Sequence, residues 1–159
     1  MQLDALLRLL DSHDVEFIIV GGVAAVLHGS ARLTQDLDVV YARTPQNLAR
    51  LVEALRDHAP YLRGAPPGLP FQWSEDTLRL GLNFTLQTDL GALDLLGEIA
   101  GGGEYQDLTN HTVETEIFGV KCRYLDLKAL IRAKRAAGRP KDLESLAELE
   151  AMNEDQRDT

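Results

Sequence analysis

The sequence predicts a single α+β domain, a mixed α/β unit in which one mixed twisted sheet is flanked by helices. Apolar segments of strand length and of helix length alternate through the first half of the chain, two hairpin patterns follow, and two helical patterns end it. The 159 residues suffice for one hydrophobic core, and no linker or internal repeat divides them. We therefore expect one domain over residues 1–152, with two C-terminal helices, and a polar C-terminal tail over residues 153–159.

The first half of the chain carries distinct helix and strand signals. Leucines recur at helical spacing near the N-terminus, and two short runs rich in β-branched residues are typical of buried strands. Thr44 and Pro45 begin a helix, because threonine caps a helix and proline suits its first position. The expected elements are a helix over 3–12, a strand over 16–20, a short helix over 23–27, a strand over 37–41 and a helix over 45–56.

The second half begins with a loop rich in proline and glycine over 60–70, long enough to suggest a function. Phe71 and Trp73 follow it as an expected hydrophobic anchor. Gly101-Gly102-Gly103 predicts a flexible loop. Asp126 caps a helix that Gly138 ends, and Pro140 begins the last one. The expected elements are strands over 77–82, 83–87, 92–96, 112–117 and 120–124, and helices over 127–137 and 140–152.

Composition narrows the compartment and the partners. No apolar run approaches the ~20 residues that span a bilayer, and the N-terminus lacks the features of a signal peptide, so we expect a cytoplasmic protein without a membrane partner. The one cysteine, Cys122, predicts neither an internal disulfide nor a disulfide-linked partner. The net charge of −9 disfavours a dedicated nucleic-acid binder, whereas the basic run over 128–141 favours a small anionic ligand or an acidic partner.

Three aspartates in apolar strands form the main chemical signal. Asp36 and Asp38 are one residue apart, so their side chains point to the same face of the strand, roughly 6 to 7 Å apart. Asp94 lies between leucines in a later strand. If the two strands are neighbours, three carboxylates converge, and their mutual repulsion calls for cations. Two magnesium ions would serve in-line nucleotidyl transfer. A solvated edge of the sheet is the plain alternative.

A glycine pair follows the first strand. Gly21 and Gly22 lie between that strand and the start of the next expected helix. Without side chains they let backbone N–H groups approach phosphate oxygens, and the helix dipole favours the negative charge. A tight packing turn is the alternative for a bare Gly-Gly. Beside two parallel carboxylates, however, the pair suggests nucleotide chemistry.

These motifs together resemble the nucleotidyltransferase superfamily, with its polymerase-beta-like fold. Its signature is an apolar residue and Gly-Gly or Gly-Ser, then an acid-x-acid pair, then a third acid on a later strand. Gly21-Gly22, Asp36-x-Asp38 and Asp94 match it. The segments 28–36 and 134–143 are also similar to a small branch that includes the AbiEii-like toxin nucleotidyltransferases and uncharacterised relatives. The resemblance extends from about Val15 to Leu149.

The resemblance implies an enzyme that moves a nucleoside monophosphate from an NTP to a hydroxyl acceptor with Mg²⁺ or Mn²⁺. The implied acceptor is a tRNA end or a protein side chain, in a toxin–antitoxin module with a cognate partner. The three aspartates would be the catalytic and metal-binding residues, with Asp94 accepting the proton of the attacking hydroxyl. The expected contacts to the triphosphate come from Gly21, Gly22, Ser30, Arg32, Thr34 and Lys134.

Several alternatives stay open in the sequence. Many active relatives carry serine where Gly22 stands, so Ser30 or Thr34 would have to supply that hydroxyl. This departure favours, as second hypothesis, a catalytically degenerate nucleotide-binding or antitoxin-like partner protein. Arg32 could equally form a structural salt bridge, and His28 and Cys122 are better explained as core residues. A glycosyltransferase would explain only the acid pair, and we rank it last.

Overall fold

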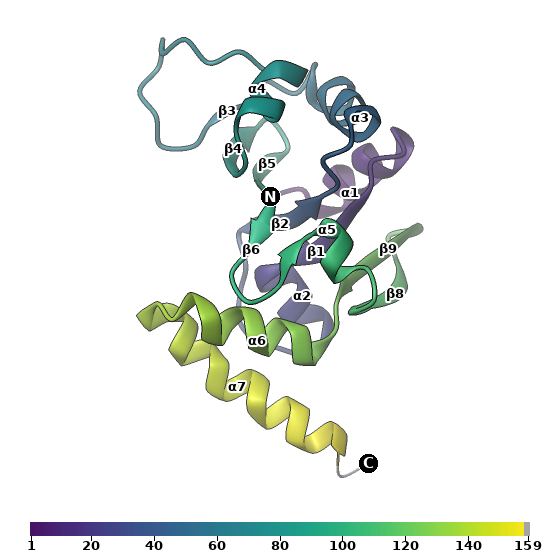
Figure 1. Ribbon diagram of the computed structural model, residues 1–159, viewed down its shortest axis with the longest axis vertical. Coiled ribbons are helices and arrows are strands. Elements are labelled where there is room, and N and C mark those ends of the chain that lie inside the picture. Colours follow the sequence, from purple (N-terminus) through teal and green to yellow (C-terminus); the bar gives the residue numbers. More distant parts are fainter. Residues whose placement is uncertain (158–159) are drawn as a thin grey trace.

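The computed structural model, which describes residues 1–157, confirms a mixed α/β domain built on a mixed sheet (Figure 1). Its seven strands lie in the order β3-β4-β5-β2-β1-β9-β8, and β6 and β7 form a separate two-stranded sheet. The strands are β1 Phe17–Val20, β2 Asp36–Tyr41, β3 Tyr61–Leu62, β4 Phe84–Thr88, β5 Gly91–Leu96, β6 Glu98–Ile99, β7 Gly103–Glu104, β8 Thr112–Ile117 and β9 Val120–Leu125. The helices are α1 Leu3–Ser12, α2 Gly21–Leu27, α3 Pro45–Leu55, α4 Glu75–Leu80, α5 Tyr105–Leu108, α6 Leu127–Ala137 and α7 Pro140–Arg157.

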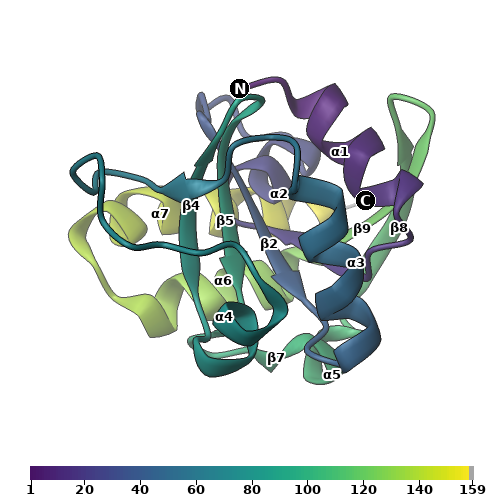
Figure 2. The same cartoon turned by 90° about the horizontal axis from the view of Figure 1, so that it is seen from above.

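Helices cover both faces of the large sheet. Figure 2 shows α3 and α4 on one side of the sheet and α6 and α7 on the other. α1 contacts α3, and α2 contacts α6, so each side is a packed layer. The leucines of β2 and β5 that lie between the aspartates, Leu37, Leu93 and Leu95, are fully buried in the core. The aspartates, which alternate with them, therefore face the layer of α2, α6 and α7.

Strand pairing at the centre of the sheet places the acidic residues. β2 runs antiparallel to β1 and parallel to β5. In this register Asp38 is opposite Val20 on one side and Asp94 on the other. α2 begins directly after β1, so the glycine pair forms its first two residues and lies beside Asp38. The fold thus brings the three sequence motifs together where β1 ends, next to β2 and β5.

The predicted helix signals are confirmed. The Thr44 side chain accepts a hydrogen bond from Asn47 N at the start of α3, and Asp126 accepts one from Ala129 N at the start of α6. Gly138 ends α6 with φ of 64°, the left-handed conformation that favours glycine. Trp73 anchors its loop, since its indole Nε1 donates to Val52 O at 3.0 Å and its ring packs on the core.

Two expectations about local structure, the strand over 77–82 and the tail after Met152, are wrong, and two expected loops contain short strands. The strand over 77–82 is helix α4, which the Ser74 side chain caps by accepting from Thr77 N. The glycine loop at 101–103 belongs to the β6–β7 hairpin, and helix α5, which was not predicted, follows it. The loop over 60–70 contains the short edge strand β3. The expected tail is helical as far as Arg157, because α7 continues past Met152, and residues 158–159 lie outside the described residues.

No helix in the described part of the chain has the length and apolar character that crossing a bilayer requires.

Candidate active site

The three aspartates converge on one face of the sheet. Asp36 and Asp38 of β2 share that face, and Asp94 of β5 lies directly opposite Asp38. One carboxylate oxygen from each residue lies within 4.8 Å of the others. The convergence predicted from strand alternation is therefore present, and it depends on β5 and β2 being parallel neighbours.

The charge of this cluster is only partly balanced. Asp38 Oδ1 is buried and has no hydrogen-bond partner. Burial raises the pKa of Asp38 to about 7, and repulsion from Asp94 and Asp36 adds to the increase, while the charge of Lys134 opposes it. A buried acceptor without a donor is costly in a folded protein. Carboxylate oxygens in this arrangement are the ligands that Mg²⁺ and Mn²⁺ prefer, so the residues present fit a divalent cation.

The glycine pair packs against the acidic strand. Gly21 has φ of +65°, and a Cβ atom built there would overlap the Asp38 carboxylate. A Cβ on Gly22 would lie 2.7 Å from Thr34 Oγ1. The Thr34 hydroxyl donates to Asp36 O at 3.1 Å, which holds it in that place. Residue 21 must therefore lack a side chain, and beside residue 22 the hydroxyl of Thr34 already fills the space.

Two neighbouring cavities open around this strand–helix junction. The larger, of about 350 Å³, is lined by Gly21 and Asp38 on the sheet side and by α6 and the start of α7 on the other. Apolar residues line it as well, among them Leu96, Ile99 and Leu130. The smaller cavity, of about 110 Å³, is lined by the remaining predicted phosphate-binding residues and part of α7. These lining residues include Gly22, Ser30, Arg32, Thr34, Lys134 and Glu148.

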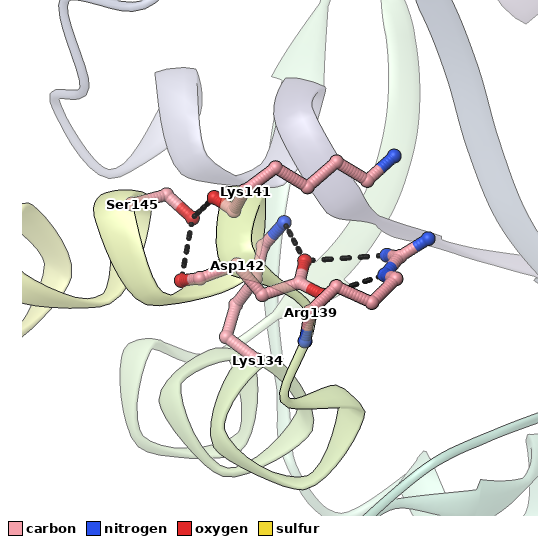
Figure 3. Close-up of polar contacts among 5 residues, drawn as sticks. All are labelled: Lys134, Arg139, Lys141, Asp142 and Ser145. Carbon is pink, nitrogen blue, oxygen red and sulfur yellow. Dashed lines mark hydrogen bonds and ion pairs between the residues drawn. The ribbon is translucent and has the colours of Figure 1, made fainter.

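Lys134 lines both cavities, and a buried acid holds it in place. Its ammonium Nζ lies 3.3 Å from Oδ1 of Asp142, a residue with no exposed surface (Figure 3). Arg139 also binds Asp142, with Nε donating to Oδ2 at 2.6 Å and Nη2 to Oδ1 at 3.2 Å. Burial alone would raise the pKa of Asp142, but the hydrogen bonds from Arg139 and Lys134 outweigh it and lower that pKa. This cluster therefore holds two positive charges on one negative charge.

The position of Asp142 differs from a simple pair with its neighbour Lys141. The Lys141 side chain extends away from the Asp142 carboxylate in Figure 3. Asp142 instead accepts a hydrogen bond from Arg139 N at 3.3 Å and so caps the start of α7. Its bond to Lys134 of the preceding helix was not anticipated, because it depends on how α6 and α7 pack.

Two other predicted phosphate contacts are already engaged within the protein. Ser30 is buried, and its hydroxyl donates to Glu148 Oε1 at 2.6 Å. The guanidinium Nε of Arg32 lies 3.8 Å from the same Glu148 oxygen. Of the two alternatives for Arg32, a phosphate contact and an internal salt bridge, the structure therefore contains the salt bridge.

Arg63 is the site residue that sequence reasoning missed. Its Nη2 atom lies 2.7 Å from Asp94 Oδ1 and 3.8 Å from Asp36 Oδ2. It follows β3 in the proline-rich segment that the sequence marked as potentially functional. Only that general signal was available, because the contact joins residues 31 positions apart.

Cys122 is a core residue as expected, whereas His28 is only partly buried, although its ring has partners within the protein. His28 Nε2 lies 2.8 Å from the carbonyl oxygen of Leu125, and its ring packs edge-on against Tyr124. Cys122 is buried, and desolvation raises the pKa of its thiol to about 11, so it remains protonated at neutral pH. Neither residue belongs to the site.

Comparisons with known proteins give a shared fold and a family. A crystal structure of the lincosamide antibiotic adenylyltransferase LnuA, with lincomycin bound, matches with a TM-score of 0.61 and 17% identity over 95% of this chain and 96% of that chain, which shows a shared fold. No curated protein matches the sequence. Residues 1–97 match the family described as "Nucleotidyltransferase of unknown function (DUF6036)". This match covers the glycine pair and all three aspartates, and the chain therefore belongs to that family of nucleotidyltransferases.

Proposed function

We propose that the protein transfers a nucleoside monophosphate from an NTP to an acceptor hydroxyl, using Mg²⁺ or Mn²⁺ held by Asp36, Asp38 and Asp94. The observation that carries this proposal is the close approach of three carboxylates, one with a buried oxygen that has no donor, beside a cavity. A divalent cation would neutralise the carboxylates and withdraw electron density from the α-phosphate. The larger cavity, next to Asp38, would receive the nucleotide.

In this proposal the chain orients the reactants and moves one proton. The acceptor oxygen forms a bond to the α-phosphorus of the NTP, and the bond between that phosphorus and the bridging oxygen of pyrophosphate breaks. The hydroxyl proton passes to the Asp94 carboxylate. Pyrophosphate leaves with the electrons of the broken bond, and the nucleoside monophosphate remains on the acceptor.

Positive charge and glycine backbone support the triphosphate. Lys134 and Arg139 share the single negative charge of Asp142, so the cluster keeps an excess positive charge beside the larger cavity. The backbone of Gly21 and Gly22 offers close approach without a side chain. The Thr34 hydroxyl lies beside Gly22, and it would have to exchange its hydrogen bond to Asp36 O for a phosphate oxygen to replace the serine of many relatives. For Ser30 and Arg32, the contacts with Glu148 support a role in shaping the smaller cavity.

The acceptor is the open part of the proposal. The sequence resemblance favours a tRNA end or a protein side chain, in a toxin–antitoxin module of the cytoplasm. The net charge of −9 favours a protein or a small molecule over long nucleic acid. A small hydroxylated antibiotic is a further class to test, because one of the structures that share the fold is a lincosamide adenylyltransferase.

One experiment tests the reaction and sorts the acceptors. Protein treated with a chelator is given each α-³²P-labelled NTP with and without Mg²⁺, and tRNA, total protein and lincosamides are supplied in separate reactions. We expect cation-dependent transfer of label to one acceptor class and equimolar release of pyrophosphate. The double variant Asp36→Asn/Asp38→Asn should abolish both, and label transfer that persists in this variant would remove the proposed site.

A catalytically degenerate binding protein is the second candidate. The absence of a side-chain hydroxyl at Gly22 is the feature that favours it. This candidate predicts cation-dependent NTP binding without release of pyrophosphate for any acceptor. Measuring NTP binding by calorimetry alongside the transfer assay separates the two functions, since only the enzyme shows both.

A further inference from the structure

Strand register places Arg63 in the same row of the sheet as the aspartates. Asp38 is opposite Asp94, and Asp94 is opposite Thr85 of β4. Arg63 N donates to Thr85 O at 2.9 Å, which continues the β3–β4 pairing by one residue. Two strand spacings, roughly 10 Å, therefore separate the backbones of Arg63 and Asp94. An extended arginine side chain spans that distance across Thr85.

The guanidinium group of Arg63 is held at two points. Nη1 donates to the backbone carbonyl oxygen of Leu86 at 3.0 Å, and Nη2 donates to Asp94 Oδ1 at 2.7 Å. The side chain is 29% exposed. The planar guanidinium fixes the angle between its donors, so a bond to the rigid β4 backbone determines where Nη2 can meet a carboxylate.

This arrangement leaves the centre of the carboxylate cluster open. Arg63 bonds to Asp94 but reaches Asp36 only at 3.8 Å, and the buried Asp38 Oδ1 has no donor at all. A guanidinium that simply replaced the cation would be expected to satisfy that oxygen. Arg63 instead contacts the outer side of the cluster, where it restrains one carboxylate and offsets part of the repulsion among the three.

We propose that Arg63 is a positioning residue, which anchors to the β4 backbone and holds the Asp94 carboxylate turned toward Asp36 and Asp38 for cation binding. The inference rests on the proposed cation-dependent function. Partners that orient a ligand typically contribute 10–100-fold to metal affinity. Arg63 therefore prepares the third ligand, which comes from a different strand than the first two.

The test is a titration of chelator-treated protein with Mn²⁺ alone, followed by calorimetry. We expect Arg63→Gln to weaken Mn²⁺ binding at least ~10-fold relative to the unmodified protein. Arg63→Lys keeps the charge but lacks the fork that joins Leu86 O to Asp94, so we expect it to recover only part of the affinity. Arg79→Gln is the matched control, because it removes an exposed arginine paired with Asp76 and should leave affinity unchanged.

Kinetics give a second readout that a merely structural role would not change. With a labelled NTP and the acceptor found above, Arg63→Gln should lower kcat at saturating Mn²⁺ while KM for the NTP stays within about twofold. Unchanged Mn²⁺ affinity in both Arg63 variants would overturn the inference while leaving the proposed function intact. Tighter binding would also overturn it, by showing that Arg63 competes with the cation. Failure of the unmodified protein to bind Mn²⁺ would defeat the cation centre, and this inference with it.

Discussion

Two charged clusters meet at the larger cavity, one of them through Asp38 alone, and their charges are balanced in opposite ways. The acidic cluster sets the three carboxylates of Asp36, Asp38 and Asp94 against the single guanidinium of Arg63. The basic cluster sets the cations of Lys134 and Arg139 against the single carboxylate of Asp142. Each is therefore left with charge of one sign. Under the proposed function, a Mg²⁺–triphosphate complex would offer both complementary charges, its cation to the acidic cluster on the sheet and its phosphates to the basic cluster on the helices.

The clusters also differ in how completely their buried acid is satisfied. Asp142 is fully buried, receives hydrogen bonds from two cations and has a lowered pKa. Asp38 has a buried oxygen without a donor and a pKa raised to about 7. A buried acid with hydrogen-bond donors stabilises the fold, whereas a buried acid without donors is typical of a ligand-binding site. Replacing Asp142 should therefore lower the free energy of unfolding, whereas replacing Asp38 should raise it relative to the unmodified protein as the pH increases.

The largest expected effect is on catalysis in the acidic cluster. Asp94→Asn removes a cation ligand and the proposed proton acceptor, so we expect the transfer rate to fall at least ~1000-fold, which is about 4 kcal/mol of activation free energy. Asp89→Asn, in the turn of the same hairpin, should change the rate less than about twofold. Single-turnover rates with labelled NTP provide the measurement. Comparable losses in both variants would indicate damage to the hairpin and would contradict a catalytic role for Asp94.

The next effect is on stability in the basic cluster. Asp142→Ala leaves two cations without their shared acid, and we expect the free energy of unfolding to fall by about 3 kcal/mol. Glu150→Ala breaks an exposed ion pair with Arg135 and should cost less than about 1 kcal/mol. Urea unfolding followed by circular dichroism measures both. Equal small losses would show that Asp142 does not hold α6 and α7 together.

A smaller effect concerns the glycine beside Asp38. Gly21→Ala should lower the free energy of unfolding by about 2 kcal/mol, because φ of +65° strains alanine and its Cβ meets the Asp38 carboxylate. Gly119→Ala has the same kind of strain at φ of +79° but open space around it, so about 1 kcal/mol is expected. The same urea titration applies. The contact with Asp38 is disproved if the two variants lose equal stability.

The smallest effect is a pH dependence of the metal-free protein. Since folding raises the pKa of Asp38 to about 7, the unfolded chain releases this proton first as pH rises above about 4. The folded state therefore loses stability up to and through pH 7. Asp38→Asn has no such proton, so its stability relative to the unmodified protein should increase by at least ~1 kcal/mol between pH 5 and pH 8. Thermal unfolding in a chelator tests this, and a difference that stays constant with pH would contradict it.

The parts of the fold and site that depend on local patterns were predictable. Alternation placed Asp36 and Asp38 on one face, and caps at Thr44 and Asp126 marked two helices. Over 77–82, the alternating apolar residues suggested a strand, although Ser74 could also cap a helix. Leu78 and Leu80 would share one face of a strand, but in the helix Leu78 is buried and Leu80 is mostly exposed. The one-turn helix α5 has a capping box from Glu104 and Asp107, a signal too short to stand out beside the glycines.

The contacts that complete the site could not be predicted in the same way. Arg63 reaches Asp94 only because β3 pairs at the sheet edge, and a strand of two residues directly after Pro60 gives no recognisable sequence signal. Asp142 meets Lys134 only because α6 and α7 fold back on each other. The extension of α7 past Met152 was also missed. The polar composition suggested a tail, but polar residues such as Glu154 can continue a helix once it has begun.

Lys134 borders both cavities, so one ammonium group serves two compartments. A ligand that draws its Nζ toward the sheet in the larger cavity withdraws positive charge from the smaller one, which Ser30, Arg32 and Glu148 surround. A ligand in one cavity would then change the positive charge available in the other through the position of the Lys134 side chain, without any movement of the backbone.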